Sequence, residues 1–220
     1  ARQMSRYTTL VQRRRAFEES SIYPVISSEF CLGRDPLKIL EQLLSGGAKV
    51  VQMREKHLAD KPYLALLKTA REMTDATGTL LIVDDRLDLA LASDADGVHL
   101  GQDDLPLADA VKIAPELLIG TSTHNREEVL QAQLDGCGYL NIGPIFPTGT
   151  KELPMAALGL DTLKELVPLV KCPFSVMGGI KLEHLAQLKA LKAKHIAAVT
   201  AFTAAPSPKA AAEEWIRLLQ

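Results

Sequence analysis

Eight short apolar runs, each followed by a segment with helical spacing, constrain the fold of this chain more than any other feature. The runs are rich in Val and Ile, and hydrophobic residues make up 47% of the chain. We expect strands at Ile22–Ile26, Val50–Arg54, Leu80–Val83, Gly97–Leu100, Leu117–Gly120, Tyr139–Gly143, Phe174–Met177 and Ile196–Thr200. These runs are continuously apolar rather than alternating, which is typical of parallel strands buried on both faces.

Amphipathic segments separate the runs, with apolar residues at the i, i+3 and i+4 spacing of helices. They span Pro36–Leu44, Tyr63–Ala76, Leu87–Ala92, Leu105–Ala114, Arg126–Leu134, Leu160–Val170, Leu182–Leu191 and Pro208–Leu219. This alternation predicts an α/β protein with a parallel sheet, and eight units fit a single (β/α)8 TIM barrel. A doubly wound open sheet is the alternative. It would more often leave a break in composition between two halves, and no Pro/Gly/Ser-rich linker interrupts the rhythm.

The first twenty residues differ from the rest because they carry several arginines and little apolar content. We expect residues 1–20 to form an N-terminal helical extension and residues 21–220 to form the catalytic barrel. The run Arg13–Arg15 is interpreted as a solvated helix face.

Charge and hydropathy restrict the partners. The 25 Lys and Arg residues are balanced by 27 Asp and Glu residues, for a net charge of -2. Nucleic-acid binding rests on a positive field, so a general nucleic-acid binder is excluded. No apolar run approaches the ~20 residues that span a bilayer, and the first residues lack the apolar core of a secretory signal. We therefore expect a cytoplasmic protein with small-molecule substrates and no membrane partner, and a homo-oligomer stays open.

The three cysteines, Cys31, Cys137 and Cys172, are widely spaced. They form no CxxC pair and no Cys/His cluster with the spacing of a zinc site. We expect three reduced thiols in or near the core.

Polar residues follow nearly every predicted strand, at the end where TIM barrels carry their active sites. Asp84 and Asp85 follow one strand, and Asp103 and Asp104 follow the next. One or two carboxylates, completed by water and phosphate oxygens, suit Mg²⁺. The alternative is that Asp85 and Asp104 cap the helices that follow them.

Cations and glycines at neighbouring strand ends predict two anionic subsites. Lys56 and Lys151 could face a metal-bound pyrophosphate group. The pair Gly178-Gly179 precedes a helix, in the position where barrels frequently bind phosphate.

Two histidines are acid–base candidates. His99 lies within an apolar strand, where a structural role is the simpler interpretation, and the role of His124 stays open. Ser122 has no His/Asp arrangement that the sequence can confirm as a triad, so it is interpreted as a hydrogen-bond donor.

Taken together, these motifs resemble the thiamine-phosphate synthase (thiamine-phosphate pyrophosphorylase) family. The matching stretches are VQMREK, DDRLDLAL, DGVHLGQDD, GTSTHN, GPIFPTGTK and GGI, in this order. The resemblance implies a Mg²⁺-dependent transferase that joins hydroxymethylpyrimidine diphosphate to thiazole phosphate or its carboxylate. It further implies that pyrophosphate leaves first, giving a pyrimidine cation that the thiazole nitrogen attacks.

The resemblance also implies roles for individual residues. Asp85 and Asp104 match the Mg²⁺ ligands, and catalysis is assigned to Lys56, Ser122 and Lys151. The substrate contacts are Gln52, Arg54, Lys56, Asp84, Ser122, Thr148, Thr150, Lys151, Gly179, Val199 and Thr200.

Three positions depart from the family pattern. Asp84 stands where the family commonly has Asn, and a further carboxylate there could tighten Mg²⁺ or weaken diphosphate binding. Thr200 replaces a frequent Ser, and Met177 replaces a smaller or branched residue.

Two alternative functions stay open. A sister group tautomerises the thiazole carboxylate phosphate with a histidine near His124, but it tends to lack the segment that carries Thr148, Thr150 and Lys151. A non-catalytic sensor of phosphate ligands on the same barrel would be expected to lose the metal carboxylates or Lys56, and both are present.

Overall fold

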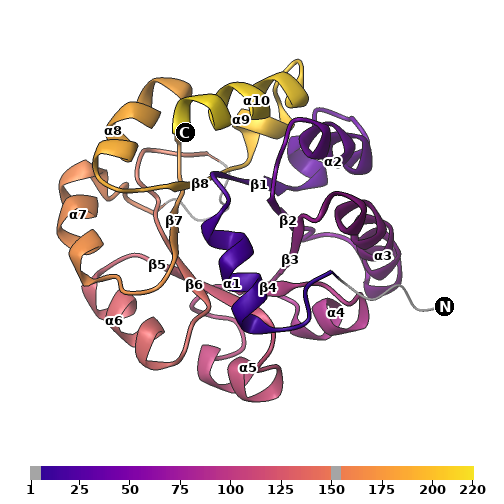
Figure 1. Ribbon diagram of the computed structural model, residues 1–220, viewed down its shortest axis with the longest axis horizontal. Coiled ribbons are helices and arrows are strands. Elements are labelled where there is room, and N and C mark those ends of the chain that lie inside the picture. The colour runs from indigo at the N-terminus through magenta and orange to yellow at the C-terminus, as the bar shows by residue number, and fades with distance from the viewer. Residues whose placement is uncertain (1–5, 150–154) are drawn as a thin grey trace.

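Eight parallel strands hydrogen-bond in chain order and close into a barrel, with β8 pairing back to β1 (Figure 1). The computed structural model describes residues 6–149 and 155–220. The strands are β1 Ile22–Ile26, β2 Val50–Met53, β3 Leu80–Asp84, β4 Gly97–Leu100, β5 Leu118–Thr123, β6 Tyr139–Ile142, β7 Phe174–Val176 and β8 His195–Ala198. The predicted (β/α)8 fold is confirmed.

Helices surround the barrel, as the ring in Figure 1 shows. The α-helices are α1 Leu10–Glu18, α2 Pro36–Ser45, α3 Asp60–Thr77, α4 Leu87–Ala92, α5 Leu107–Ile113, α6 Arg126–Leu134, α7 Gly159–Leu166, α8 Leu185–Ala190, α9 Thr200–Thr203 and α10 Pro208–Leu219. Three 3₁₀ turns lie at Ser28–Phe30, Val167–Leu169 and Leu182–His184. In the described ranges, no helix is both long and apolar enough to cross a membrane.

The predicted ends of two strands, β5 and β8, needed correction. Strand β5 continues through Thr123 instead of stopping at Gly120, because Thr121 to Thr123 keep pairing with β6. Strand β8 ends at Ala198, and Thr200 begins the short helix α9 rather than ending a strand. Both differences move a candidate site residue, Ser122 onto a strand and Thr200 into a helix.

Alternate residues of the strands pack into two separate apolar layers. Val51, Leu81 and Ile119 face the surrounding helices in the larger cluster. Val50 and Leu80 face the barrel interior in a smaller cluster with further residues. That interior cluster consists of Phe17, Tyr23, Val50, Leu80, Ile82, Leu118, Tyr139 and Ala197. The barrel is thus a packed core rather than a pore.

Helix α1 lies across the opening at the barrel floor, the end where the strands begin (Figure 1). Thr9 and Gln12 form a capping box at its start, which satisfies backbone donors that a helix leaves unpaired. Phe17 is fully buried and stacks on Tyr139 with ring centroids 4.6 Å apart. It also meets Tyr23 edge-on at 5.8 Å. The extension therefore supplies part of the barrel's own core.

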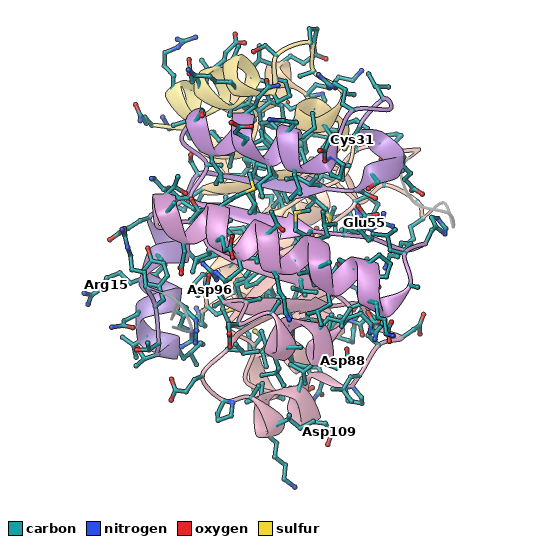
Figure 2. All side chains as sticks on the ribbon, turned by 90° about the vertical axis from the view of Figure 1, so that its right-hand side faces the viewer. Arg15, Cys31, Glu55, Asp88, Asp96 and Asp109 are labelled. Atoms are coloured by element: carbon teal, nitrogen blue, oxygen red, sulfur yellow. The ribbon has the colours of Figure 1, made fainter. Side chains whose placement is uncertain are left out.

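The interpretation of Arg13–Arg15 as a solvated helix face is wrong for Arg13. This side chain is buried and donates to the Glu116 carbonyl at 2.6 Å and to Asp96 Oδ1 at 3.4 Å. Asp96, which Figure 2 places beside α1, has no exposed surface and also accepts from Arg71 at 2.6 Å. A buried carboxylate requires such pairing. Arg15 is exposed and points away from the barrel (Figure 2).

Replacing Phe17 with Ala tests whether α1 is part of the core. We expect Phe17→Ala to lower the free energy of unfolding by about 3–5 kcal/mol, because it removes a buried ring and leaves a cavity. Urea denaturation measures this change. Val11→Ala on the same helix is the control, since Val11 is 70% exposed. Equal effects of the two substitutions would contradict the assignment.

His195 makes stability depend on pH. Burial, helped by the charge of Lys194, lowers its pKa from 6.5 to about 4. The unfolded chain therefore takes up this proton first as the pH falls, so the stability contributed by neutral His195 is present above pH 6.5 and lost towards pH 4. We expect His195→Gln to flatten the loss of unfolding free energy in this window. A slope in His195→Gln equal to that of the wild type would contradict this role of His195.

Candidate active site

The carboxyl ends of the strands lie opposite α1, as Glu55 and α1 show in Figure 2. This end gathers most of the predicted site residues. Gln52 lies on β2, Asp84 ends β3 and Ser122 lies on β5. Thr150 and Lys151 lie outside the described residues.

An ion-pair cluster occupies the barrel mouth after β2 and β3. Lys56 Nζ lies 2.9 Å from Asp84 Oδ2 and also contacts Asp85 Oδ2. Burial alone would lower the pKa of Lys56, but the two carboxylates outweigh it and raise that pKa. Burial and the neighbouring charge of Asp85 raise the pKa of Asp84 to about 6. The lysine thus balances a concentration of negative charge.

Arg54 adds a second cation beside this cluster. Its guanidinium lies 3.8 Å from Asp84 Oδ2 and 3.9 Å from Glu29 Oε1. Asp84 is therefore the carboxylate that both Lys56 and Arg54 approach.

Asp85 and Asp104 come together from neighbouring strand ends, close enough for one carboxyl group to donate a hydrogen bond to the other when it is protonated. Burial and this contact raise the pKa of Asp104. Burial would also raise the pKa of Asp85, but the hydrogen bonds from Lys56 and Asp104 outweigh it and lower that pKa. Two carboxylates in contact repel unless a proton or a cation lies between them.

The alternative interpretation of both residues as helix caps is wrong. The N-cap positions of α4 and α5 are Arg86 and Pro106, and neither helix has a side-chain cap. Asp85 instead adopts a left-handed backbone with φ 64°, and its N–H donates to the His99 carbonyl at 2.8 Å. Such a conformation is costly for a residue with a side chain and is often found at functional sites.

The pair fits a magnesium ion by its chemistry. Within ranges 6–149 and 155–220, no group of three or more His, Cys, Asp or Glu side chains gathers around a metal-sized space. Mg²⁺ is commonly held by one or two carboxylates, with water and substrate phosphates completing its shell. Asp85 and Asp104 offer such a partial set.

A chain of hydrogen bonds crosses the barrel interior from β2 to β5. Gln52 Nε2 donates to the Tyr23 hydroxyl at 2.9 Å, and the Tyr23 and Tyr139 hydroxyls are 2.7 Å apart. The Tyr139 hydroxyl lies 2.7 Å from His99 Nδ1, and His99 Nε2 lies 2.8 Å from Ser122 Oγ. Residues on five strands are thereby fixed relative to one another.

A cavity of about 80 Å³ lies inside the barrel mouth. Its lining includes four residues of this hydrogen-bonded chain, Tyr23, Gln52, His99 and Ser122. Arg54, Asp84 and Asn141 contribute further polar atoms, and Met177 and Val199 contribute apolar surface. Its lining runs from Arg54 and Asp84 at the mouth to His99 inside the barrel.

Of the two histidines, His99 reaches this cavity. His124 pairs with Glu128 on α6, with Nδ1 2.7 Å from Oε1. His99 is therefore both a structural residue, through Tyr139, and a site residue, through Ser122.

A second cavity of about 50 Å³ lies beyond the ends of β7 and β8. Its lining includes Thr148, Gly179, Val199 and Thr200, which the sequence resemblance predicts to contact substrate. Met177 and Val199 line both cavities, so the two subsites adjoin.

The glycine pair at this subsite is required by close packing. Gly178 and Gly179 both have positive φ, 106° and 63°. A Cβ on Gly179 would lie 2.3 Å from the Pro147 carbonyl oxygen, and one on Gly178 would lie 2.5 Å from Pro144 Cα. The loop after β6 thus rests directly on this backbone.

Sequence reasoning missed Tyr23, Tyr139 and Asn141. The available signal was a polar side chain inside a buried strand, since a buried tyrosine hydroxyl needs a partner. Each of the three lies in such a run.

Comparisons with known proteins identify the family of this chain. The family model for thiamine monophosphate synthase matches residues 22–202. A thiamine-phosphate synthase of Chloroflexus aurantiacus is 42% identical over 193 residues, covering 88% of this chain and 89% of the relative. One of Pyrococcus horikoshii is 39% identical over 181 residues, covering 82% and 87%. The solved structure of thiamine phosphate pyrophosphorylase from Pyrococcus furiosus superposes with a TM-score of 0.85 at 33% identity, covering 92% of this chain and 96% of that one. The chain belongs to the thiamine monophosphate synthase family.

Proposed function

We propose that this chain is a thiamine-phosphate synthase, a transferase that couples hydroxymethylpyrimidine diphosphate with thiazole phosphate or its carboxylate and releases pyrophosphate. Family membership supports the reaction. The observation that carries the proposal is the contact of Asp85 with Asp104 beside Lys56 at the barrel mouth.

Asp85 and Asp104 would hold Mg²⁺. When bound, the ion supplies positive charge that stabilises the leaving pyrophosphate. Its support is the close approach of two carboxyl groups that would repel if both were charged with no cation beside them.

Lys56 and Arg54 would bind the diphosphate, together with Lys151, which stays a sequence-based prediction. Both described cations face Asp84 at the mouth and are held near it by ion pairs. Gln52 and Asp84 would complete the contacts of the pyrimidine diphosphate, because both line the adjoining cavity.

Ser122 would donate a hydrogen bond to a diphosphate oxygen. The Gln52 amide nitrogen donates to the Tyr23 hydroxyl, so an order in which the hydrogens run from Gln52 towards Ser122 satisfies every member of the interior chain. In that order Tyr139 donates to His99 Nδ1 and His99 Nε2 donates to Ser122 Oγ. The serine hydrogen is then available for the substrate.

The thiazole phosphate would bind at the second cavity, through Thr148, Thr150, Gly179, Val199 and Thr200. Thr148 and Thr200 supply hydroxyls there, and Gly179 brings backbone close to the ligand. The shared wall of the two cavities would set the thiazole beside the pyrimidine. Such positioning lowers the barrier to attack.

The reaction would be dissociative, with pyrophosphate leaving before the thiazole nitrogen attacks. Supporting this order, the described mouth combines Lys56 with a carboxylate pair that would hold Mg²⁺, and the charge of a bound ion would stabilise the leaving anion. Ser122 Oγ meets His99 Nε2, and His99 Nδ1 meets the Tyr139 hydroxyl, an arrangement that differs from a Ser-His-Asp triad.

The contacts favour the synthase over the tautomerase alternative. His124, the histidine that a tautomerase would use, pairs with Glu128. The carboxylates and cations that a diphosphate site would use lie together at the barrel mouth. We also propose residues 21–220 as the catalytic barrel domain, residues 1–20 as its extension, and a cytoplasmic location with small phosphorylated substrates.

Metal dependence tests the function. We expect purified protein given both substrates to release pyrophosphate and form thiamine phosphate with Mg²⁺, and EDTA to stop the reaction. Asp104→Asn is expected to lower kcat/KM roughly hundredfold, because charge stabilisation of the leaving group is lost. Asp103→Asn is the matched control at a neighbouring exposed carboxylate. Absence of product with every divalent metal would refute the proposed activity.

Replacing Asp84 with Asn tests how this departure from the family pattern affects substrate binding. Asp84→Asn removes the carboxylate that pairs with Lys56 and Arg54, so both cations can turn to the diphosphate. We expect KM for the pyrimidine diphosphate to fall roughly fivefold, a change worth about 1 kcal/mol. Asp88→Asn makes the same charge change at an exposed ion pair on α4 and is expected to leave KM unaltered. An unchanged or higher KM in Asp84→Asn would show that Asp84 does not compete with the substrate.

A further inference from the structure

Two cysteines that are distant in the sequence meet at the barrel floor. The Sγ atoms of Cys137 and Cys172 are 3.6 Å apart, and both thiols are free. Each residue stands just before a strand, Cys137 before β6 and Cys172 before β7. The expected location in or near the core is confirmed for all three cysteines, but the spacing of Cys137 and Cys172 in the sequence did not indicate this contact.

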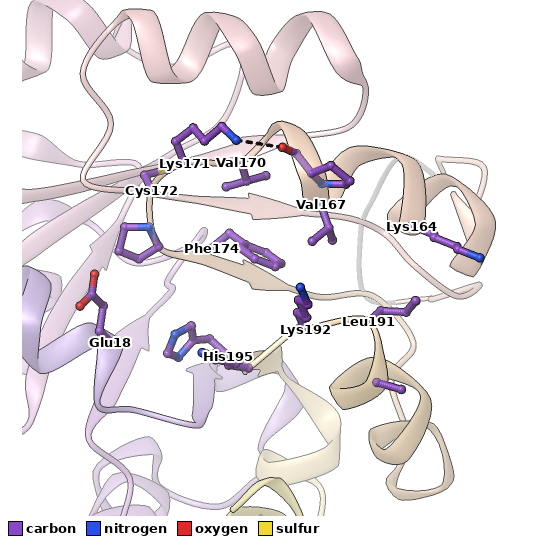
Figure 3. Close-up of a pocket in the computed structure, with 14 residues that line it drawn as sticks. Glu18, Lys164, Val167, Val170, Lys171, Cys172, Phe174, Leu191, Lys192 and His195 are labelled. Carbon is purple, nitrogen blue, oxygen red and sulfur yellow. Dashed lines mark hydrogen bonds between the residues drawn. The ribbon is translucent and has the colours of Figure 1, made fainter.

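The surroundings of the two thiols differ. Cys137 is 2% exposed and packs in the core. Cys172 is partly exposed and lines a cavity of about 850 Å³, seen in Figure 3. One thiol of the pair can therefore meet a small molecule, and the other lies behind it.

This cavity lies at the starts of β7 and β8, away from the candidate active site. Val167, Val170 and Phe174 form part of its wall, and Figure 3 shows them between the labelled lysines. No residue of the cluster at the barrel mouth lines it. Its chemistry is thus separate from that of the proposed reaction.

The cavity is electropositive. Lys164, Lys171, Lys192 and Lys194 line it, and among the described lining residues Glu18 is the acidic one. His195 also lines it, and burial lowers the pKa of this histidine to about 4, so it is neutral near pH 7. A ligand that carries carboxylates would meet favourable charge.

Arg14 adds a cation beside the thiols. Its guanidinium donates to the Cys137 carbonyl at 3.0 Å and to the Gly138 carbonyl at 3.4 Å. The hydrogen bond from Cys137, assisted by the charge of Arg14, lowers the pKa of Cys172. The same contact and burial raise the pKa of Cys137. Because Cys172 is partly exposed at the cavity and Cys137 is buried, Cys172 is the cysteine that a small disulfide reaches first, and thiolates are the nucleophiles in disulfide exchange.

We propose that Cys172 and Cys137 form a redox-active pair, in which Cys172 attacks small disulfides carrying carboxylates and Cys137 closes a disulfide within the protein. This inference does not depend on the proposed synthase activity. It rests on the contact of the two sulfurs and on the charged cavity that only Cys172 of the pair lines.

The exchange balances in two steps. The Cys172 thiolate attacks one sulfur of the small disulfide, whose S–S bond breaks and whose other half leaves as a thiolate. Cys137 then loses its proton to solvent and attacks Cys172 Sγ, which expels the second half as a thiolate. The protein gives up two electrons and two protons, and the small disulfide becomes two thiols.

Oxidised glutathione serves as the probe, with intact-protein mass spectrometry as the readout. We expect reduced wild-type protein to lose the mass of two hydrogens, with peptide mapping showing the Cys137–Cys172 cross-link. Cys137→Ser is expected to keep one glutathione, because its mixed disulfide cannot be resolved. Cys172→Ser is expected to react about tenfold more slowly, since the thiol at the cavity is gone. Cys31→Ser, at a buried cysteine outside the pair, is expected to behave like the wild type.

Three results would overturn the assignment: a stable glutathione adduct on the wild type, undiminished reaction of Cys172→Ser, or no oxidation at all. The wild-type cross-link is decisive even where a serine variant folds poorly. Hydroxyethyl disulfide, which is neutral, tests the ligand class. High salt is expected to slow oxidised glutathione several-fold and to spare the neutral reagent, because salt screens exposed lysines. Equal slowing would remove the preference for anionic disulfides.

Discussion

Tyr139 is the residue on which the interior of this barrel depends. Its ring stacks on Phe17 from the floor, and its hydroxyl joins Tyr23 to His99 near the mouth. The ring also occupies the space beside Gly120, where an added Cβ would lie 2.0 Å from it. One side chain therefore connects the packing of α1 with the position of Ser122. A shift of Phe17 would be transmitted to the site through two rigid rings rather than through flexible chain.

The sequence was sufficient for the features that local pattern determines. Buried parallel strands read as apolar runs, so all eight strands and most helices could be predicted. The rule that barrel sites lie at strand carboxyl ends then located Asp84, Asp85 and Asp104 correctly at one mouth. The extension of β5 to Thr123 was not predicted. Thr and Ser are common in loops, and only the pairing with β6 identifies these residues as part of a strand.

Contacts that form only when the strands close into a barrel could not be predicted from the sequence. Nothing local to Tyr23 or Tyr139 indicates that their hydroxyls meet across the barrel, 116 positions apart in the chain. Arg13 was predicted to be exposed to solvent, because its partner, Asp96, lies on a distant segment of the sequence. Cys137 and Cys172 likewise meet only because β6 and β7 are neighbours. In each case a polar or reactive group acquires its role from a partner that strand order supplies.

The charge at the barrel mouth constrains the proposed chemistry. Among the residues that the structure describes there, the three carboxyl groups of Asp84, Asp85 and Asp104 outnumber the cations Lys56 and Arg54. A diphosphate approaching this set alone would meet net negative charge, and Lys56 is already engaged by two of the carboxylates. A divalent cation held by Asp85 and Asp104 would offset this negative charge. On the proposed function, Asp84 therefore makes diphosphate binding more dependent on such a cation than an asparagine would.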